Sequence, residues 1–174
     1  LHYDEPANLI LARQIAEDQY RPVFIEAYTG KEVLFFYAAA PWVWMTGGTA
    51  WGGRLGAATI GILTVAVTYT AVRFLLGSRS YTRPVALYAA AWMAVAFPHV
   101  LLSRYGFRAI TQPLLQGLTV ALLWRGLRQR QARWLLLAGV SLGLTGYTYL
   151  AARLFPAPVV LACGWALIRA PRRG

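Results

Sequence analysis

After Glu32 the chain contains neither aspartate nor glutamate, although it continues to residue 174. The six acidic residues all stand in the first 32 positions: Asp4, Glu5, Glu17, Asp18, Glu26 and Glu32. Proton- and ion-coupled transporters commonly place ionisable residues inside their membrane spans, and the apolar part of this chain has no carboxylate to place there. The absence argues against coupled transport and confines any carboxylate chemistry to the opening segment.

Cysteine and charged residues are scarce as well. The single cysteine, Cys163, lies within an apolar run, which excludes a disulfide within the chain and a zinc site built on thiolates. Charged residues make up 13% of the chain, against about 25% in soluble domains. In a soluble protein, the net charge of +11 would predict a nucleic-acid partner. Here the arginines cluster between hydrophobic runs, where membrane anchoring explains them, so no nucleic-acid partner is predicted.

Five stretches of the chain lack charged side chains: Leu55–Val72, Pro84–Ser103, Ala109–Trp124, Trp134–Ala152 and Leu154–Ile168, with 18, 20, 16, 19 and 15 residues. About 20 apolar residues of helix cross a bilayer core of about 30 Å, so the shorter two are near the lower limit. The sequence therefore predicts an all-α polytopic membrane protein. Its five transmembrane helices are expected at about 55–73, 84–103, 108–125, 133–151 and 154–169.

The arginines between these stretches fall into two alternating sets. One set holds ten: Arg73, Arg79, Arg83, Arg125, Arg128, Arg130, Arg133, Arg169, Arg172 and Arg173. The other holds four: Arg54, Arg104, Arg108 and Arg153. The positive-inside rule assigns the larger set to the cytoplasm, which predicts a multi-pass cell-membrane protein with its opening segment outside. Any one of the four outer arginines is explained as well by a snorkelling membrane anchor as by a binding role. Four of them together, on the face that also carries the acids, favour an anionic ligand.

Residues 1–54 are expected to form an extracytoplasmic catalytic loop with two juxtamembrane helices, at about 5–18 and 31–46. In the first helix, apolar residues such as Leu9 and Ile10 line one side, as in helices that lie in the membrane surface. Residues 55–174 then form the transmembrane part.

The uncharged run 33–53 is the one ambiguous segment. Pro41 and the glycines of its second half disfavour a spanning helix, so we expect it at the outer interface. A spanning helix there would invert the orientation of every later span. The chain begins at Leu1 and ends just after its last apolar run, so we expect both ends to be truncated.

Asp4, Glu5 and Lys31 are the residues of the opening segment that could carry chemistry. Helix capping accounts for Asp4 and Glu5, whereas the functional alternative is a general base or an acceptor-binding carboxylate. Lys31, the only lysine, is either an interfacial anchor or a partner for a phosphate at a helix N-terminus.

No cofactor is predicted. His2, Asp4, Glu26 and Glu32 are the residues of this face that could bind a divalent metal, but they do not follow any strong ligand spacing, so a metal stays an alternative that is not predicted.

Five ordered segments together resemble one known family. The segments are DEPANLILARQIAEDQ, GKEVLFFYAAA, GRLGAATIGILTVAVTY, SRYGFRAITQPLL and GYTYLAARLFP. In this order they are similar to the bacterial branch of the GT-C glycosyltransferases. These are the family 39 enzymes related to protein O-mannosyltransferases and lipid A aminoarabinose transferases. The resemblance covers nearly the whole chain, but only about the N-terminal third of a typical member.

The resemblance implies an integral-membrane glycosyltransferase with a GT-C-type helix bundle. Such an enzyme moves a sugar from a polyprenyl-phosphate donor to a lipid, glycan or protein acceptor at the extracytoplasmic face, with inversion. Asp4 matches the aspartate of the family's Asp-Glu pair, which acts on the acceptor as a base or orienting group, and Lys31 matches the basic residue that faces the lipid phosphate. Arg54 matches the arginine that opens the next span, and Ser103-Arg104 a Ser-Arg pair near the outer end of a later span. The candidate residues are thus Asp4 and Glu5 for catalysis, and Lys31, Arg54, Arg104, Arg108 and Arg153 for the donor phosphate.

Two positions depart from the family pattern. Many relatives have a Pro-Pro pair after the lysine, where this chain has Glu32-Val33. Many also carry an aspartate several residues after the Ser-Arg pair, where this chain has Arg108-Ala109-Ile110. The sugar and the acceptor are therefore left open.

Two other classes of function compete with this interpretation. A multi-pass transporter is disfavoured by spans without carboxylates. A function as a non-catalytic lipid-binding protein does not explain why the opening segment is rich in acidic residues.

Overall fold

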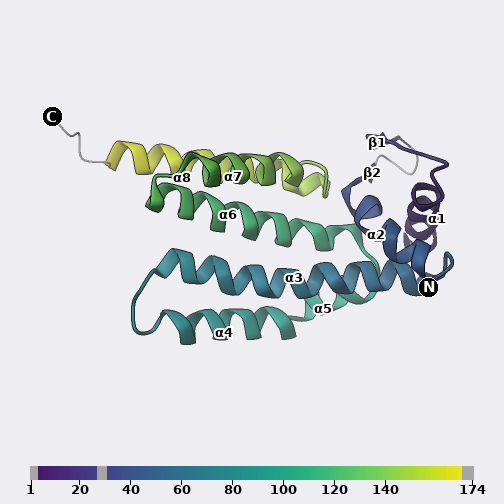
Figure 1. The fold of residues 1–174 in the computed structure, drawn as a ribbon, viewed down its shortest axis with the longest axis horizontal. Helices are drawn as coiled ribbons and strands as arrows, with labels where there is room; N and C mark the ends of the chain where they lie inside the picture. Colours follow the sequence, from purple (N-terminus) through teal and green to yellow (C-terminus); the bar gives the residue numbers. More distant parts are fainter. Residues whose placement is uncertain (1–3, 27–30, 170–174) are drawn as a thin grey trace.

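The computed structural model describes residues 4–26 and 31–169, and the side chains of Asp4 and of residues 165–169 fall outside that description. The described part is mostly helical, as Figure 1 shows, which confirms the all-α prediction at the level of secondary structure. The helices are α1 (Asp4–Ala16), α2 (Leu34–Met45), α3 (Ala50–Leu76), α4 (Thr82–Val95), α5 (Phe97–Arg104), α6 (Thr111–Gln129), α7 (Ala132–Thr145) and α8 (Pro156–Arg169). Two short 3-10 helices, η1 (Arg108–Ile110) and η2 (Leu150–Leu154), precede α6 and α8.

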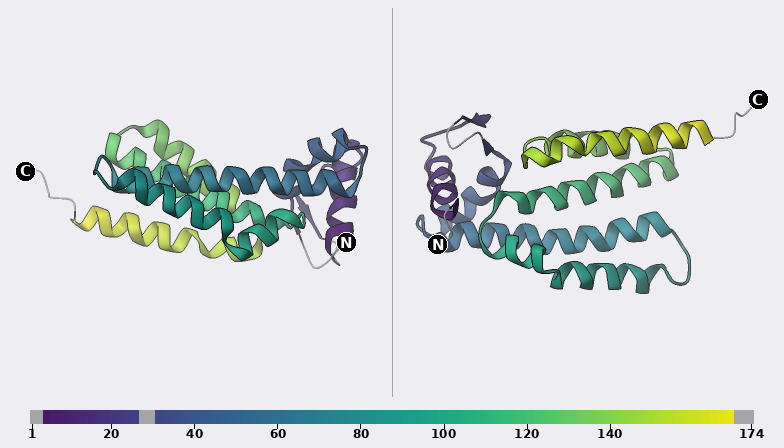
Figure 2. Two further views of the ribbon diagram at one scale, coloured as in Figure 1. Left: turned by 90° about the horizontal axis from the view of Figure 1, so that it is seen from below. Right: turned by 180° about the vertical axis from the view of Figure 1, so that it is seen from behind.

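The longer helices run along the long axis of the molecule, and two short N-terminal helices lie at one end of them (Figures 1 and 2). Helix α3 packs against both α4 and α6, and α6 packs against α7. Helices α1 and α2 pack on each other and on α3. The two ends of the bundle therefore differ: one carries α1 and α2, and the other carries the α3–α4 and α6–α7 connections.

Helix α3 is, among the described residues, the one helix long and apolar enough to cross a bilayer by itself. Its 27 residues correspond to about 40 Å. Helices α4 and α5 qualify together as a second span, bent by 55° where they meet. Pro98 accounts for the bend, because its ring has no N–H and would clash with a carbonyl of the preceding turn. The predicted helix 84–103 is therefore two helices.

The remaining predicted spans correspond to shorter elements. The segment 133–151 contains α7 and then a turn in place of one continuous helix. Two threonine hydroxyls bond to nearby carbonyls there, Thr145 to Leu142 O at 2.5 Å and Thr148 to Thr145 O at 2.7 Å. Such side-chain bonds compete with helical backbone bonds. The number of membrane crossings stays a prediction.

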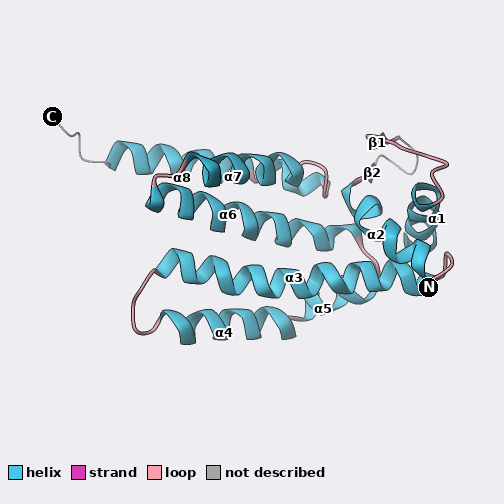
Figure 3. Ribbon diagram, in the orientation of Figure 1, coloured by secondary structure: helices cyan, strands magenta, loops and turns pink. Residues whose placement is uncertain are grey.

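The segment after residue 30 differs from the expected helix. Residues Lys31–Glu32 form strand β2, antiparallel to β1 (Phe24–Ile25), and α2 begins only at Leu34 (Figure 3). Helix α2 has 12 residues, about 18 Å, which is shorter than a bilayer core of about 30 Å. Two residues with positive φ, Gly47–Gly48, separate it from α3. The run 33–53 is thus not one spanning helix.

The apolar core lies where α1, α2 and α3 meet. Phe35 and Phe36 are almost fully buried in it, with ring centroids 5.8 Å apart in an edge-to-face arrangement. The cluster is completed by Leu11, Ala12, Ile25, Val33, Ala39, Val43, Ala57, Ile60 and Ile110. Many large apolar side chains of the longer helices are exposed instead, among them Trp92 at 76% and Leu136 at 72%. Such an exterior is expected of helices that face lipid.

Gly52 brings α3 against the end of α2. A Cβ atom added there would lie 2.6 Å from Val43 Cα and 2.8 Å from Trp42 O, so the backbone would have to move. A Cβ atom added at the next residue, Gly53, would meet nothing within 4 Å. The two neighbouring glycines therefore form a matched pair.

We expect Gly52→Ala to destabilise the fold by about 1–3 kcal/mol because it overpacks this contact. Gly53→Ala should be close to neutral. Thermal unfolding of the detergent-solubilised protein, followed by circular dichroism, measures both effects. Equal Tm values for the two variants would contradict the close approach of α2 and α3.

Candidate functional site

Charged and amide side chains, most of them buried, form three groups of contacts at the end of the bundle that carries α1 and α2, and this set is called the buried network. It consists of Glu5 and Asn8 from α1, Lys31 and Glu32 from β2, Arg54 from α3, Arg108 from η1 and Arg153 from η2. The first four residues are only 4–5% exposed. Because an unpaired buried charge is very costly, the partners of these groups determine whether the arrangement is stable.

Glu5 and Arg54 form a bidentate ion pair. Arg54 donates from Nε to Oε1 at 2.6 Å and from Nη2 to Oε2 at 3.1 Å. The Glu5 side chain is 6% exposed and that of Arg54 is 33% exposed. The guanidinium also lies 5.9 Å from the centre of the Trp51 ring. This fork-to-fork geometry fixes the orientation of the guanidinium and ties α1 to the start of α3.

Glu32 is held between two arginines from distant parts of the chain. Arg108 Nη1 donates to Oε2 at 2.9 Å, and Arg153 Nη2 donates to Oε1 at 3.4 Å. The Arg108 side chain is 17% exposed and stacks over the Tyr149 ring at 5.2 Å, whereas Arg153 is 55% exposed. One carboxylate thus joins β2 to the segments that precede α6 and α8.

Lys31 and Glu32 reach different neighbours because successive residues of a strand point to opposite sides. Lys31 Nζ donates to Asn8 Oδ1 at 3.2 Å, and Asn8 Nδ2 donates to the Gly106 carbonyl at 3.4 Å. The amide of Asn8 therefore links the strand to the connection between α5 and η1. The predicted helix from residue 31 would instead set the two side chains about 100° apart, so strand geometry is what allows both contacts.

Two predicted site residues lie apart from these contacts. Arg104 occupies the last turn of α5, is exposed, and forms no ion pair with any carboxylate that the structure describes. Asp4 is the first residue of α1, and its side chain lies outside the described residues. Within the described ranges, no three histidine, cysteine or acidic side chains gather as metal ligands would.

Asn8 was not predicted from the sequence, and only part of the apolar side predicted for α1 faces the core, since Leu9 packs against it. Ile10, expected on the apolar side, is 54% exposed. The buried positions of the helix are Glu5, Asn8, Leu11 and Ala12. They are spaced as one helical stripe, so a signal was present in the sequence. Apolar periodicity does not reveal it, because half of its members are polar.

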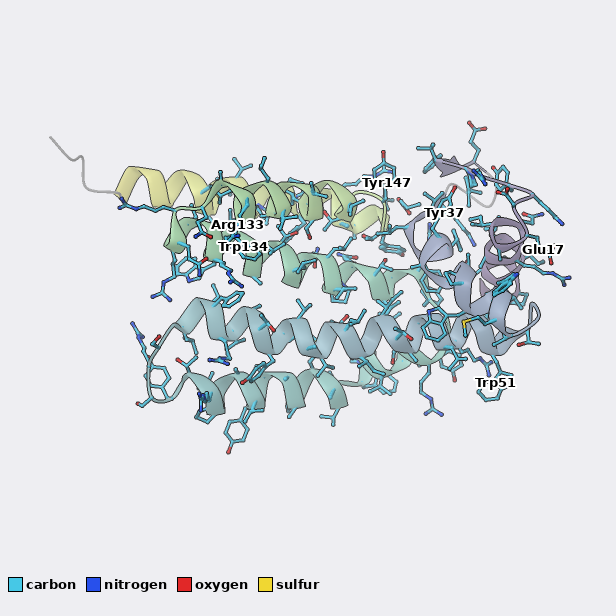
Figure 4. The ribbon with its side chains drawn as sticks, in the orientation of Figure 1. Glu17, Tyr37, Trp51, Arg133, Trp134 and Tyr147 are labelled. Atoms are coloured by element: carbon cyan, nitrogen blue, oxygen red, sulfur yellow. The ribbon has the colours of Figure 1, made fainter. Side chains whose placement is uncertain are left out.

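The other described acids of α1 and its exit lie on the surface. Glu17, at the edge of the molecule in Figure 4, accepts from Arg13 Nε at 2.6 Å, with side chains 38% and 56% exposed. Asp18 pairs with Arg21, whose guanidinium holds the pKa of that carboxyl below its ordinary value by a hydrogen bond. Exposed pairs of this kind contribute little to stability, so they are suitable controls.

We expect the two partners of Glu32 to differ in their contribution to stability. Arg108→Gln should lower the free energy of unfolding by about 3 kcal/mol, because it removes the closer and more buried partner of a buried carboxylate. Arg153→Gln should cost less than about 1 kcal/mol, because that side chain is half exposed.

Denaturant unfolding in mixed micelles, with Arg13→Gln as the exposed control, measures this difference. A larger loss for Arg153→Gln than for Arg108→Gln would refute the assignment of Arg108 as the principal partner.

Comparison with known proteins places the chain in a family. The profile of the dolichyl-phosphate-mannose-protein mannosyltransferase family matches residues 19–173, which is most of the chain. No curated protein and no solved structure matches it. The match confirms the family resemblance and includes four of the five ordered segments, whereas the segment with Asp4 and Glu5 precedes the matched residues. The chain belongs to the dolichyl-phosphate-mannose-protein mannosyltransferase family, a family of membrane glycosyltransferases.

Proposed function

We propose that the chain is the donor-binding and catalytic part of a glycosyltransferase of the cell membrane. It transfers a sugar from a polyprenyl phosphate to a hydroxyl or amine of a protein, lipid or glycan at the extracytoplasmic face. The observation that carries the proposal is the buried Glu5–Arg54 pair directly after Asp4, at one end of α3. Arg54 and Arg73 of that helix are 19 residues apart, about 28 Å, which is close to the thickness of a bilayer core.

In this proposal the basic residues of the network stabilise the departing phosphate. Arg54 uses Nε and Nη2 for Glu5, so its Nη1 edge is left for a phosphate oxygen. Arg153 holds Glu32 weakly, at 3.4 Å, and is half exposed, so a phosphate can compete for it. Lys31 and Arg108 add positive charge deeper in the network, and Arg104 adds it at the surface. Guanidinium groups suit this task because they bind phosphate oxygens in pairs, and the low dielectric of a buried site strengthens each contact.

The two carboxylates at the start of α1 take different tasks. Asp4 is proposed as the general base for the acceptor, a role that contributes about 10²–10⁴-fold to rate. Glu5 is buried and fully engaged with Arg54, so we assign it to positioning that guanidinium. The donor's lipid tail stays in the bilayer, so the reaction takes place at the membrane surface. A site at the end of a spanning helix lies at that surface, where both the donor and the acceptor can bind.

We expect Asp4→Asn to reduce sugar transfer at least about 100-fold, because the neutral amide cannot accept a proton. The assay uses membranes that contain the full-length protein at matched expression and a panel of polyprenyl-phosphate-linked sugars. Glu17→Gln, which neutralises an exposed carboxylate directly after the same helix, should retain wild-type activity. If Asp4→Asn is as active as wild type, Asp4 is a helix cap and not the base.

The proposed single displacement predicts inversion at the anomeric carbon. Nuclear magnetic resonance of the product's anomeric proton, compared with that of the donor, measures the configuration. Retention, or the isolation of a covalent glycosyl-enzyme, would contradict direct attack by the acceptor.

A further inference from the structure

A groove lined with arginines lies at the end of the bundle far from the buried network. The end of α3, the start of α4 and the end of α6 enclose a volume of about 850 Å³. Its arginines are Arg73, Arg79, Arg83, Arg125 and Arg128. The volume is that of a site for a small molecule or a headgroup, since such sites measure about 300–1,000 Å³.

No described carboxylate neutralises these five arginines. The sequence has no acidic residue after Glu32, and each ion pair among the described residues uses an acid from residues 5–32. At the other end of the bundle, Arg54 and Arg108 are each paired with a buried carboxylate. Like charges that share one groove repel each other, and a bound anion relieves that repulsion. The groove therefore favours a negatively charged ligand.

Neighbours without charge hold two of the arginines in place. Arg128 Nη1 donates to the Phe74 carbonyl at 3.3 Å. The Arg125 guanidinium lies 4.0 Å from the centre of the Trp134 ring and 5.0 Å from that of Phe74. Figure 4 shows Trp134 at this end of the bundle. Cation–π contacts orient a guanidinium without cancelling its charge, so the groove is organised as well as positive.

Thr82, in the first turn of α4, provides an independent indication of a ligand. It lines the groove and is 3% exposed. Its hydroxyl oxygen is, among the described residues, the one buried side-chain polar atom without a hydrogen-bond partner. Buried polar groups are nearly always paired, and a hydroxyl next to clustered arginines suits a phosphate oxygen.

The position of the groove indicates which kind of phosphate it takes. Arg73 lies about 28 Å along α3 from Arg54, so the groove is at the headgroup level of the opposite leaflet. A second groove, of about 700 Å³, begins at Val85 on α4 and is lined by apolar residues that include Trp92. We propose that the arginine groove binds the phosphate of an anionic phospholipid, with an acyl chain along this apolar face of α4. The site is separate from the proposed transferase site.

Lipid titration of the purified full-length protein in detergent tests the proposal. Dioleoylphosphatidylglycerol, dioleoylphosphatidylcholine and sodium phosphate are added separately, and Tm is followed by tryptophan fluorescence. We expect a saturable rise in Tm with phosphatidylglycerol and none with phosphatidylcholine or phosphate at equal concentrations. Thr82→Val should weaken the response although no charge is removed.

A matched pair of charge variants locates the site. Arg125→Gln/Arg128→Gln removes two charges from the groove and should weaken binding about tenfold or more. Arg130→Gln/Arg133→Gln removes two charges from the same end, but from residues that do not line the groove, and should bind like wild type. If the first variant does not fold, Arg73→Gln/Arg79→Gln replaces it.

Three results would overturn the proposal. Equal weakening by the groove variant and its control would mean that diffuse surface charge attracts the lipid. Stabilisation by sodium phosphate as strong as that by phosphatidylglycerol would assign the groove to a soluble phosphate. A folded Thr82→Val protein with unchanged affinity would exclude the hydroxyl from the site.

Discussion

The buried carboxylate of Glu32 is the point at which the N-terminal segment is joined to the later helices. Its partners, Arg108 and Arg153, stand 76 and 121 residues further along the chain. A buried carboxylate without a partner would strongly destabilise the fold. Strand β2 and the segments before α6 and α8 must therefore all be in place for the fold to be stable. Glu5 and Arg54 impose the same condition on α1 and α3. The end of the bundle is thereby fixed by a few ion pairs in addition to its small apolar core.

Glu32 and Arg108 are also the two positions at which the sequence was expected to depart from the family pattern that it resembles. Glu32 stands directly after Lys31, and Arg108 stands four residues after Arg104 of the Ser-Arg pair. In the structure, Arg108 Nη1 lies 2.9 Å from Glu32 Oε2. The two side chains that distinguish this sequence in that resemblance therefore contact each other directly.

Burial accounts for Glu5 and Glu32, the two buried acids of the opening segment. At the end with α1 and α2 the arginines are partly covered by protein, and each covered guanidinium needs a carboxylate. At the other end the arginines line an open groove, and no carboxylate that the structure describes pairs with them. The helix α3 joins these two environments through an apolar stretch about as long as a bilayer core is thick.

The sequence by itself determined the helical class, the family, the apolar stretches and the concentration of acids in the opening segment, because these depend on composition and local pattern. Glu5 pairs with Arg54, and Lys31 bonds to Asn8 of the same helix as Glu5, whereas the proposed roles of these residues stay predictions. Only the tertiary structure decided that residues 31–32 form a strand, that Asn8 is buried, and that Glu32 pairs with Arg108 and Arg153. The local sequence does not reveal which residue pairs with a buried charge. That partner is determined by which segments, far apart in the chain, lie close together in the folded protein.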